Sequence, residues 1–400
     1  MNTDDPQAIR LPTGLMLGIG LMYLAAYQIF KLPPVLPVLL ESYQYDRILA
    51  GGFMSVYAVV GLFLSVPLGR MVVRTGPVLV TIFSILFMIA GNIAGLIYGS
   101  SGGAMLLARG LEGVGFAGFA IVGPVLANRY ASRAMLPIVI SLTAIWIPVG
   151  QLLAAGITPF ILPHYDWGGL WWIGIGGTVI LGIISIPALQ GMTSIEHNAG
   201  TIERDAARSF SPTHRRRLFI SASLFTVFSI QYLGFMTWLP QYLVEVQNMT
   251  AAESALVYMV PVAIVIPASL LSGWMFGMGF KPEQLMIGGM MLIAIVWGLI
   301  PVASQGMWGI VLMMVYGVGA GVTPTCLFAM PSNISVSDGS TADAFGIIMT
   351  GRSLGVLIGP MLLAWIFTVS GTWSYVAPVF LVTTVIGCGL SLSLYRALKQ

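Results

Sequence analysis

Long apolar stretches, each followed by a short polar connection, recur along the whole 400-residue chain. A helix needs about 20 mostly apolar residues to cross the hydrocarbon layer of a bilayer. Stretches of that length lie at 13–39, 49–68, 78–99, 104–127, 136–162, 167–189, 216–243, 253–276, 284–303, 305–330, 343–369 and 373–395. This pattern predicts an all-α integral membrane protein with twelve transmembrane helices.

The longest hydrophilic segment, residues 190–217, divides these stretches into two groups of six. The groups are partly repeated, because Gln231 follows Gln28 by 203 positions and the same shift aligns the Leu-Pro pairs that begin at 36 and 239. Parallel six-helix repeats are typical of secondary transporters. We therefore expect an N-terminal six-helix bundle at 1–189, a cytoplasmic linker at 190–217 and a C-terminal six-helix bundle at 218–400.

Composition excludes a soluble globular protein. Hydrophobic residues make up 57% of the chain and charged residues 8%, with a mean hydropathy of +0.93, whereas soluble domains carry about 25% charged residues. Most of the surface must therefore face the lipid bilayer, and we expect no nucleic-acid partner. The two cysteines, Cys326 and Cys388, lie in apolar runs and show no metal-ligand spacing, so no metal or cofactor is expected.

The basic residues predict the orientation in the membrane. If both termini and the linker are cytoplasmic, 13 of the 17 Lys and Arg residues lie on that side and only Arg47 lies on the other. Cytoplasmic loops of membrane proteins carry such an excess. We expect a multi-pass protein of the cell membrane, a bacterial inner membrane, with cytoplasmic N- and C-termini. The polar head leads directly into the first span, which we expect to be retained rather than cleaved.

The connection between the second and third spans carries a recognisable motif. It runs from Gly69 to Pro77, and Gly69, Arg74 and Gly76 match the pattern G-x-x-x-D-R/K-x-G-R/K of the major facilitator superfamily. Val73 takes the place of the acid in that pattern, and Pro77 takes the place of the last base. In the family this acid helps to latch the cytoplasmic gate.

The fourth span resembles the same family more specifically. Residues 109–115 read Arg-Gly-Leu-Glu-Gly-Val-Gly, similar to the family pattern R-x-x-Q-G-x-G with Glu112 in place of Gln. The Arg-x-x-Glu-Gly form looks like that of organic-anion symporters within the superfamily. The resemblance implies two bundles that alternate their access to a central site, with Gly69, Arg70, Arg74 and Gly76 at the cytoplasmic gate.

Only four ionisable residues lie within the predicted spans: Lys31, Arg109, Glu112 and Arg352. Buried charges cost several kcal/mol in a bilayer and are functional candidates for that reason. Lys31 and Arg352 belong to opposite halves, and together they are predicted to hold an anionic substrate. The alternatives are that Lys31 extends to the membrane interface and that Arg352 caps carbonyl groups of a broken helix.

Arg109 and Glu112 lie three residues apart on one helix and can touch. A buried carboxylate beside an arginine can change its protonation state when water or a competing anion reaches it, so this pair is the candidate for proton coupling. A permanent ion pair that holds the fourth span in place is the alternative. Five polar or aromatic residues would complete a substrate cavity, although packing explains each singly: Tyr27, Gln28, Tyr57, Trp146 and Gln231.

These observations predict a monomeric secondary transporter that takes up a small organic anion, such as a carboxylate, by proton-coupled symport. A proton-coupled exporter of drugs or metabolites and a carrier of inorganic anions (cyanate- or nitrate-like) remain alternatives. An enzyme is not expected. A dinucleotide-type glycine pattern at 113–118 lies inside a span with no preceding strand, and a nucleophile-elbow pattern at 351–355 lies inside a span with no histidine at membrane depth.

Overall fold

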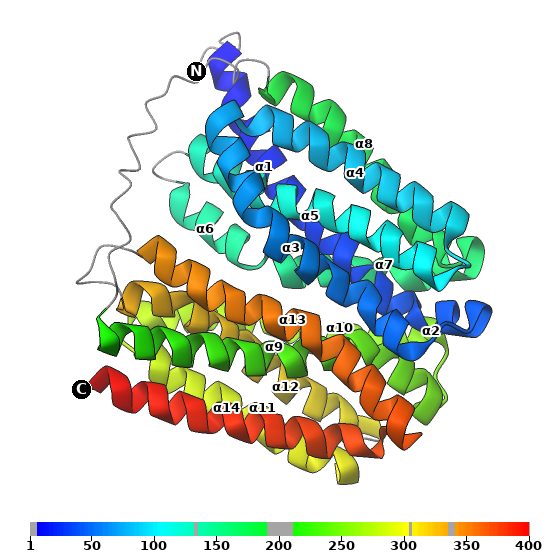
Figure 1. Cartoon of the computed structure of the whole chain (residues 1–400), viewed down its shortest axis with the longest axis vertical. Helices are drawn as coiled ribbons and strands as arrows, with labels where there is room; N and C mark the ends of the chain where they lie inside the picture. The colour runs from blue at the N-terminus through cyan, green and yellow to red at the C-terminus, as the bar shows by residue number, and fades with distance from the viewer. Residues whose placement is uncertain (1–5, 132–134, 190–210, 304–305, 335–340, 400) are drawn as a thin grey trace. The chain divides into compact units, whose positions relative to one another are not determined.

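The computed structural model describes residues 6–131, 135–189, 211–303, 306–334 and 341–399, and these residues are almost entirely helical (Figure 1). One short 3-10 helix, η1 (Trp373–Tyr375), interrupts the α-helices. The α-helices are α1 (Pro6–Phe30), α2 (Leu32–Tyr43), α3 (Arg47–Thr75), α4 (Pro77–Tyr98), α5 (Gly102–Tyr130), α6 (Leu136–Ala144), α7 (Trp146–Tyr165), α8 (Gly168–Leu189), α9 (Pro212–Gln247), α10 (Ala251–Gly277), α11 (Pro282–Ala303), α12 (Gly306–Ile334), α13 (Thr341–Ser370) and α14 (Val376–Lys399).

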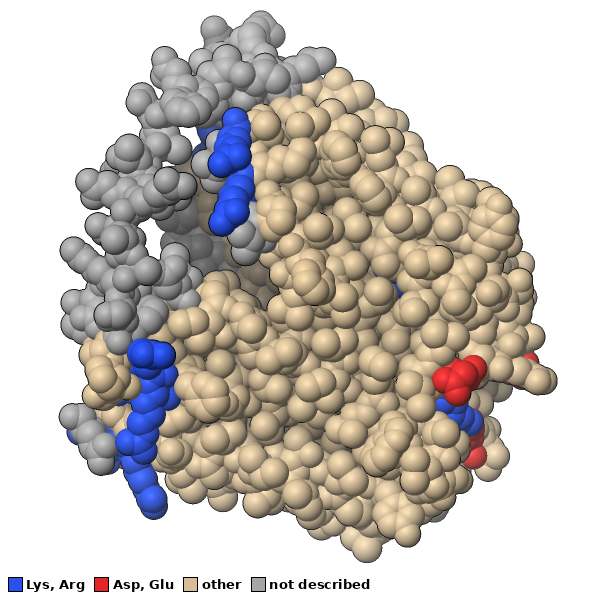
Figure 2. Space-filling model, viewed as in Figure 1, with Lys and Arg blue, Asp and Glu red and all other residues tan. Residues whose placement is uncertain are grey.

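Twelve helical segments in the described residues are long and apolar enough to cross a membrane, as the hydrophobic pattern predicts. One of them, Thr13–Tyr43, combines α1 and α2. The surface is apolar as well: in Figure 2 charged side chains are sparse on the face in view. Phe63, Phe160 and Trp308 are each at least 70% exposed. In a bilayer these side chains would face acyl chains.

The fifth predicted span, 136–162, is divided in the structure. α6 ends at Ala144, Ile145 leaves the helical conformation, and α7 begins at Trp146. Pro148 explains the position of this break, because proline has no N–H to donate to the carbonyl of Ala144 four residues earlier. Only α7 is long enough to be counted as a span.

The first span is also broken, at Lys31 between α1 and α2. Pro33 and Pro34 follow immediately and supply no N–H groups, so the carbonyls of Ile29 and Phe30 lose their helical donors. Pro33, Pro34 and Pro37 together predict an interruption of this span. The break occurs before Pro33 and Pro34, whereas at Pro37 the prediction is wrong, because α2 continues through it to Tyr43.

Contacts divide the chain into two units. The first contains α1, α2 and α4–α8 with most of α3; the second contains α9–α14 together with Ala50–Ser55. Most of the predicted linker, 190–217, lies outside the described residues, and from Pro212 onward it already belongs to α9. In the first unit α1 packs on α5, α7 and α8, and α4 packs on α5. Leu21, Met88 and Phe119 from α1, α4 and α5 are fully or almost fully buried in its core.

In the second unit, α9 and α13 approach closely along a row of glycines. A Cβ atom at Gly351 would lie 2.1 Å from the carbonyl oxygen of Ala222, and one at Gly355 would lie 2.4 Å from that of Thr226. Neither position has room for a side chain. Gly351, Gly355 and Gly359 recur every four residues, a spacing that predicts a tight helix–helix contact, and the structure shows this contact with α9.

Candidate functional site

Glu112 of α5 is the centre of a buried charged cluster in the first unit. Its side chain is fully buried and accepts hydrogen bonds from three others. Lys31 Nζ donates to Oε1 at 3.1 Å, and the Tyr57 hydroxyl donates to Oε2 at 2.7 Å. Arg109 Nη1 also donates to Oε2, from one turn earlier on the same helix. The predicted contact between Arg109 and Glu112 is therefore present, and Lys31 joins it.

The ammonium group of Lys31 has all three of its donors occupied. Besides Glu112, it donates to Gln28 Oε1 at 2.7 Å and to Asn92 Oδ1 at 2.6 Å. It also lies 4.3 Å from the ring centroid of Trp171, within the range of a cation–π contact. Lys31 is 0% exposed, so it does not extend to the membrane interface. The helix break at Lys31 places this side chain among α4, α5 and α8 instead.

Arg109 stabilises that helix break. Its Nη1 donates to the carbonyl of Gln28 at 2.9 Å, and its Nη2 donates to the carbonyl of Ile29 at 2.8 Å. The carbonyl of Ile29 is the one that Pro33 leaves without a donor. Arg109 therefore caps a broken helix, the kind of role that the sequence offered as an alternative for Arg352. The planar guanidinium of Arg109 distributes these hydrogen bonds over two nitrogens, whereas all the donors of a lysine leave one nitrogen.

Gln28 links the cluster to α8. Its Nε2 donates to the carbonyl of Gly174 at 3.0 Å and lies 3.3 Å from Thr178 Oγ1, while its Oε1 accepts from Lys31. A Cβ atom at Gly174 would lie 2.7 Å from this amide, so only glycine allows the contact. With two bases and one acid, the cluster carries a formal net charge of +1 away from water.

The other predicted site residues of the first unit lie beside this cluster. The Tyr27 hydroxyl donates to the carbonyl of Leu170 at 2.8 Å, so its polar group is already paired with the backbone. Trp146 stacks on Phe116 with ring centroids 5.8 Å apart, and Phe116 contacts Tyr57 in turn. Residues Asn92 and Trp171 belong to the cluster without having been singled out in the sequence. A single asparagine in an apolar span could have indicated the first; one tryptophan among many gives no such signal.

The second unit has a neutral counterpart. Gln231 Oε1 accepts from Trp297 Nε1 at 3.2 Å and from the Tyr316 hydroxyl at 3.0 Å. Under shifts of 203 to 205 positions Trp297 corresponds to Asn92, Tyr316 to Glu112 and Gly234 to Lys31. The repeat therefore keeps the glutamine and replaces its charged surroundings with neutral residues, two of which are aromatic. Gln231 Nε2 is buried and has no hydrogen-bond partner in the part of the chain that the structure describes.

Arg352 lies in α13 of the second unit. It makes no hydrogen bond or ion pair with the described residues, although Tyr232 lies within electrostatic range of it. Lys31 and Arg352 belong to different units, and the joint hold on an anion stays a prediction.

The predicted gate residues lie around the junction of α3 and α4. Gly76 ends α3 with φ of 80°, a conformation that favours glycine, and Arg70 and Arg74 are exposed. A Cβ atom at Gly69 would meet open space. Their role at a gate stays a prediction. Among the described residues, no group of three His, Cys, Asp or Glu side chains is placed to hold a metal ion.

Comparison with known proteins identifies the family. The model of the "Major Facilitator Superfamily" matches residues 15–338. A Haemophilus influenzae protein described as "Putative metabolite transport protein" is 25% identical over 276 residues, which cover 62% of this chain and 66% of that protein's length.

A solved structure shows the same fold. The crystal structure of a mutant of the nucleoside transporter NupG superposes with a TM-score of 0.74 at 13% identity, covering 96% of this chain and all of that one. The twelve candidate spans, the charged cluster within them and the family match over most of the chain lead to one conclusion: the chain belongs to the major facilitator superfamily, and it is a multi-pass membrane transporter.

Proposed function

We propose that the protein takes up a small organic anion, such as a carboxylate, by proton-coupled symport across a bacterial inner membrane, and that it works as a monomer. The observation that carries the proposal is the position of Glu112, fully buried between Lys31 and Arg109. One carboxylate therefore balances two cations, and any event that neutralises it leaves both cations without a counter-charge.

Protonation of Glu112 is such an event. It converts the cluster from a net charge of +1 to +2 in surroundings where charge is costly. An anion that then binds beside Lys31 restores the balance. Proton binding and anion binding each favour the other, and this reciprocity is the thermodynamic basis of symport. Lys31 is the group best placed to exchange partners, because Arg109 is also anchored to two backbone carbonyls.

Arg352 supplies a second cation for the substrate in this proposal. Its guanidinium makes no ion pair with the described residues and can offer a carboxylate two parallel hydrogen bonds. Gln28, Gln231, Tyr27, Tyr57 and Trp146 would line the path or position the charged groups. Access would alternate between the two faces of the membrane, with Arg70 and Arg74 at the cytoplasmic gate.

Two other functions make different demands on the same residues. A carrier of inorganic anions would use the same cations but would reject carboxylates with a side chain. An exporter of cationic drugs would use Glu112 to bind its substrate, yet here this carboxylate already accepts three hydrogen bonds. We therefore favour the organic anion.

The test is transport by the purified protein in proteoliposomes. Radiolabelled monocarboxylates, nitrate, cyanate and a cationic dye are offered with and without an inward proton gradient. We expect a carboxylate to accumulate only when the gradient is present. In Glu112→Gln we expect exchange of internal for external substrate to persist while gradient-driven accumulation disappears. Accumulation by Glu112→Gln equal to that of the wild type would refute the coupling role, and transport of the dye alone would refute the anion.

A further inference from the structure

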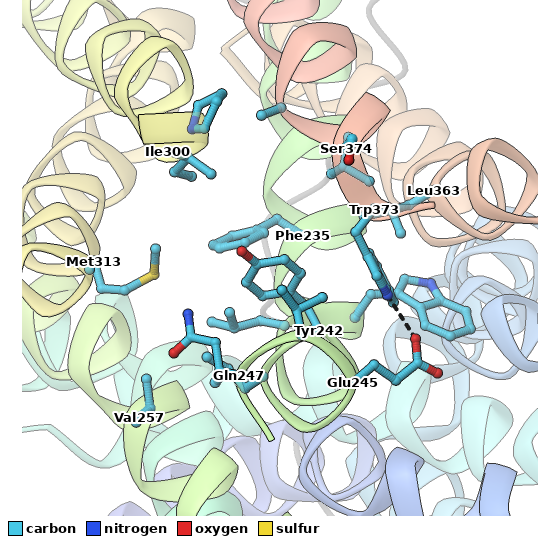
Figure 3. Close-up of a pocket in the computed structure, with 18 of the residues that line it drawn as sticks. Phe235, Tyr242, Glu245, Gln247, Val257, Ile300, Met313, Leu363, Trp373 and Ser374 are labelled. Atoms are coloured by element: carbon cyan, nitrogen blue, oxygen red, sulfur yellow. Dashed lines mark hydrogen bonds between the residues drawn. The ribbon is translucent and has the colours of Figure 1, made fainter. Parts of the chain in front are cut away.

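The second unit contains a pocket that the charged cluster does not explain (Figure 3). Its volume is about 620 Å³, within the range of small-molecule sites, which is roughly 300–1,000 Å³. It is lined by the end of α9, the start of α12, the end of α13 and η1, with parts of α10, α11 and α14. These helix ends lie opposite the end of the unit that carries the C-terminus, so the predicted orientation makes it the extracytoplasmic end.

Aromatic rings form the walls of the pocket. In one group of rings, Trp373 lies 4.9 Å from Phe367 and 5.8 Å from Tyr242 between ring centroids. In another group, Phe235 meets Trp297 edge to face at 5.0 Å. In Figure 3, Phe235 and Tyr242 lie next to each other at the centre of the lining residues, with Trp373 beside them. Walls of this kind favour a flat ring, which can pack against their faces and edges.

The repeat explains why the pocket carries no cation at this level. Arg109 of the first unit corresponds to Met313 under the shift of 204, and Asn92 corresponds to Trp297 under the shift of 205. Met313 and Trp297 both line the pocket, so a thioether and an indole take the places of a guanidinium and an amide. The indole N–H of Trp297 is held by Gln231, so a ligand in the pocket would lie one side chain away from the glutamine that the two halves share.

The polar groups of the pocket disfavour an anion. The described lining contains no Lys, Arg or His, and its only charged residue is Glu245. The Glu245 carboxylate accepts a hydrogen bond from Trp373 Nε1 at 2.7 Å and one from Gln241 Nε2 at 2.6 Å. Gln247 and Ser374 also line the pocket, and both are neutral hydrogen-bonding groups. A second copy of the proposed substrate anion therefore does not fit this chemistry.

We propose that this pocket binds a neutral, flat aromatic molecule whose ring packs against these aromatic walls and whose hydroxyl or amide group hydrogen-bonds near Gln247. The site is separate from the proposed anion and proton site. The proposal for this pocket does not depend on the proposed transport function.

Equilibrium dialysis on the full chain in lipid nanodiscs tests the proposal with three probes of the same ring: 2-naphthylmethanol, 2-naphthoate and 2-naphthylmethylammonium. Empty nanodiscs correct for partition into lipid. We expect saturable binding of 2-naphthylmethanol at least tenfold tighter than that of either charged probe. Tighter binding of the ammonium probe would overturn the neutral assignment, because Glu245 would then determine the ligand.

Two pairs of variants locate the binding. Val257→Phe fills the pocket from α10 and should weaken binding at least tenfold, whereas Leu256→Phe, at a neighbouring position that is 51% exposed, should leave it unchanged. Trp373→Leu removes one wall, with Trp274→Leu as its exposed control. Circular dichroism and melting confirm that each variant is folded. Saturable binding that survives both Val257→Phe and Trp373→Leu, or no saturable binding to the wild type, would overturn the proposal.

Discussion

Replacement of Glu112 by glutamine tests the balance of charges in the first unit most directly. The amide keeps the shape of the side chain but removes the single negative charge that Lys31 and Arg109 share, and all three side chains are 0% exposed. Removing one partner of a buried ion pair costs about 3–5 kcal/mol, because the remaining charge is left uncompensated. We expect Glu112→Gln to lower the free energy of unfolding by an amount in that range.

A second substitution separates charge from shape. Lys31→Met in the Glu112→Gln background returns the cluster to the wild-type net charge of +1, so we expect it to recover part of the lost stability. The matched control is Glu41→Gln, which makes the same change at an exposed position of α2 and should alter stability by less than about 0.5 kcal/mol.

The assay is equilibrium unfolding in lipid nanodiscs, followed by tryptophan fluorescence and by loss of helical circular dichroism. A transported carboxylate, once identified, should stabilise Glu112→Gln more than the wild type, because the variant lacks its own counter-charge. Two results would refute the reasoning that the cluster is balanced by charge. One is a Glu112→Gln variant as stable as the wild type. The other is a double variant whose free energy of unfolding is lower than the two single substitutions predict when their effects are added.

Three further predictions concern other positions. Arg109→Lys should destabilise the protein by about 1–3 kcal/mol, because the donors of an ammonium all leave one nitrogen and cannot match the carbonyls of Gln28 and Ile29 together with Glu112; equilibrium unfolding measures this. Gly355→Ala should cost about 1–3 kcal/mol through its clash with α9, whereas Gly346→Ala, where a Cβ meets open space on the same helix, should be neutral or stabilising; thermal unfolding of the two variants checks the difference. Arg352→Gln should abolish saturable uptake of the carboxylate without lowering the melting temperature, and normal uptake by this variant would exclude Arg352 from substrate binding.

The sequence alone determined the number of spans and the class of the protein. A span is a local property, because about 20 apolar residues suffice to cross a bilayer whatever surrounds them. The division of the 136–162 stretch into α6 and α7 was missed, although Pro148 was available to predict it. The contact between Arg109 and Glu112 followed from helical periodicity, since residues three apart share a face.

Only the tertiary structure decided which charges meet. Lys31 and Glu112 are 81 positions apart, and helical periodicity gives the face of a residue on its own helix but not the helix that this face contacts. The prolines after Lys31 predicted the break in the first span; the packing of α1 on α5 decided that Arg109 caps the freed carbonyl of Ile29. The pocket of the second unit could not be predicted for the same reason. Its lining residues come from helices that are distant in sequence, and periodicity does not show which helices pack together.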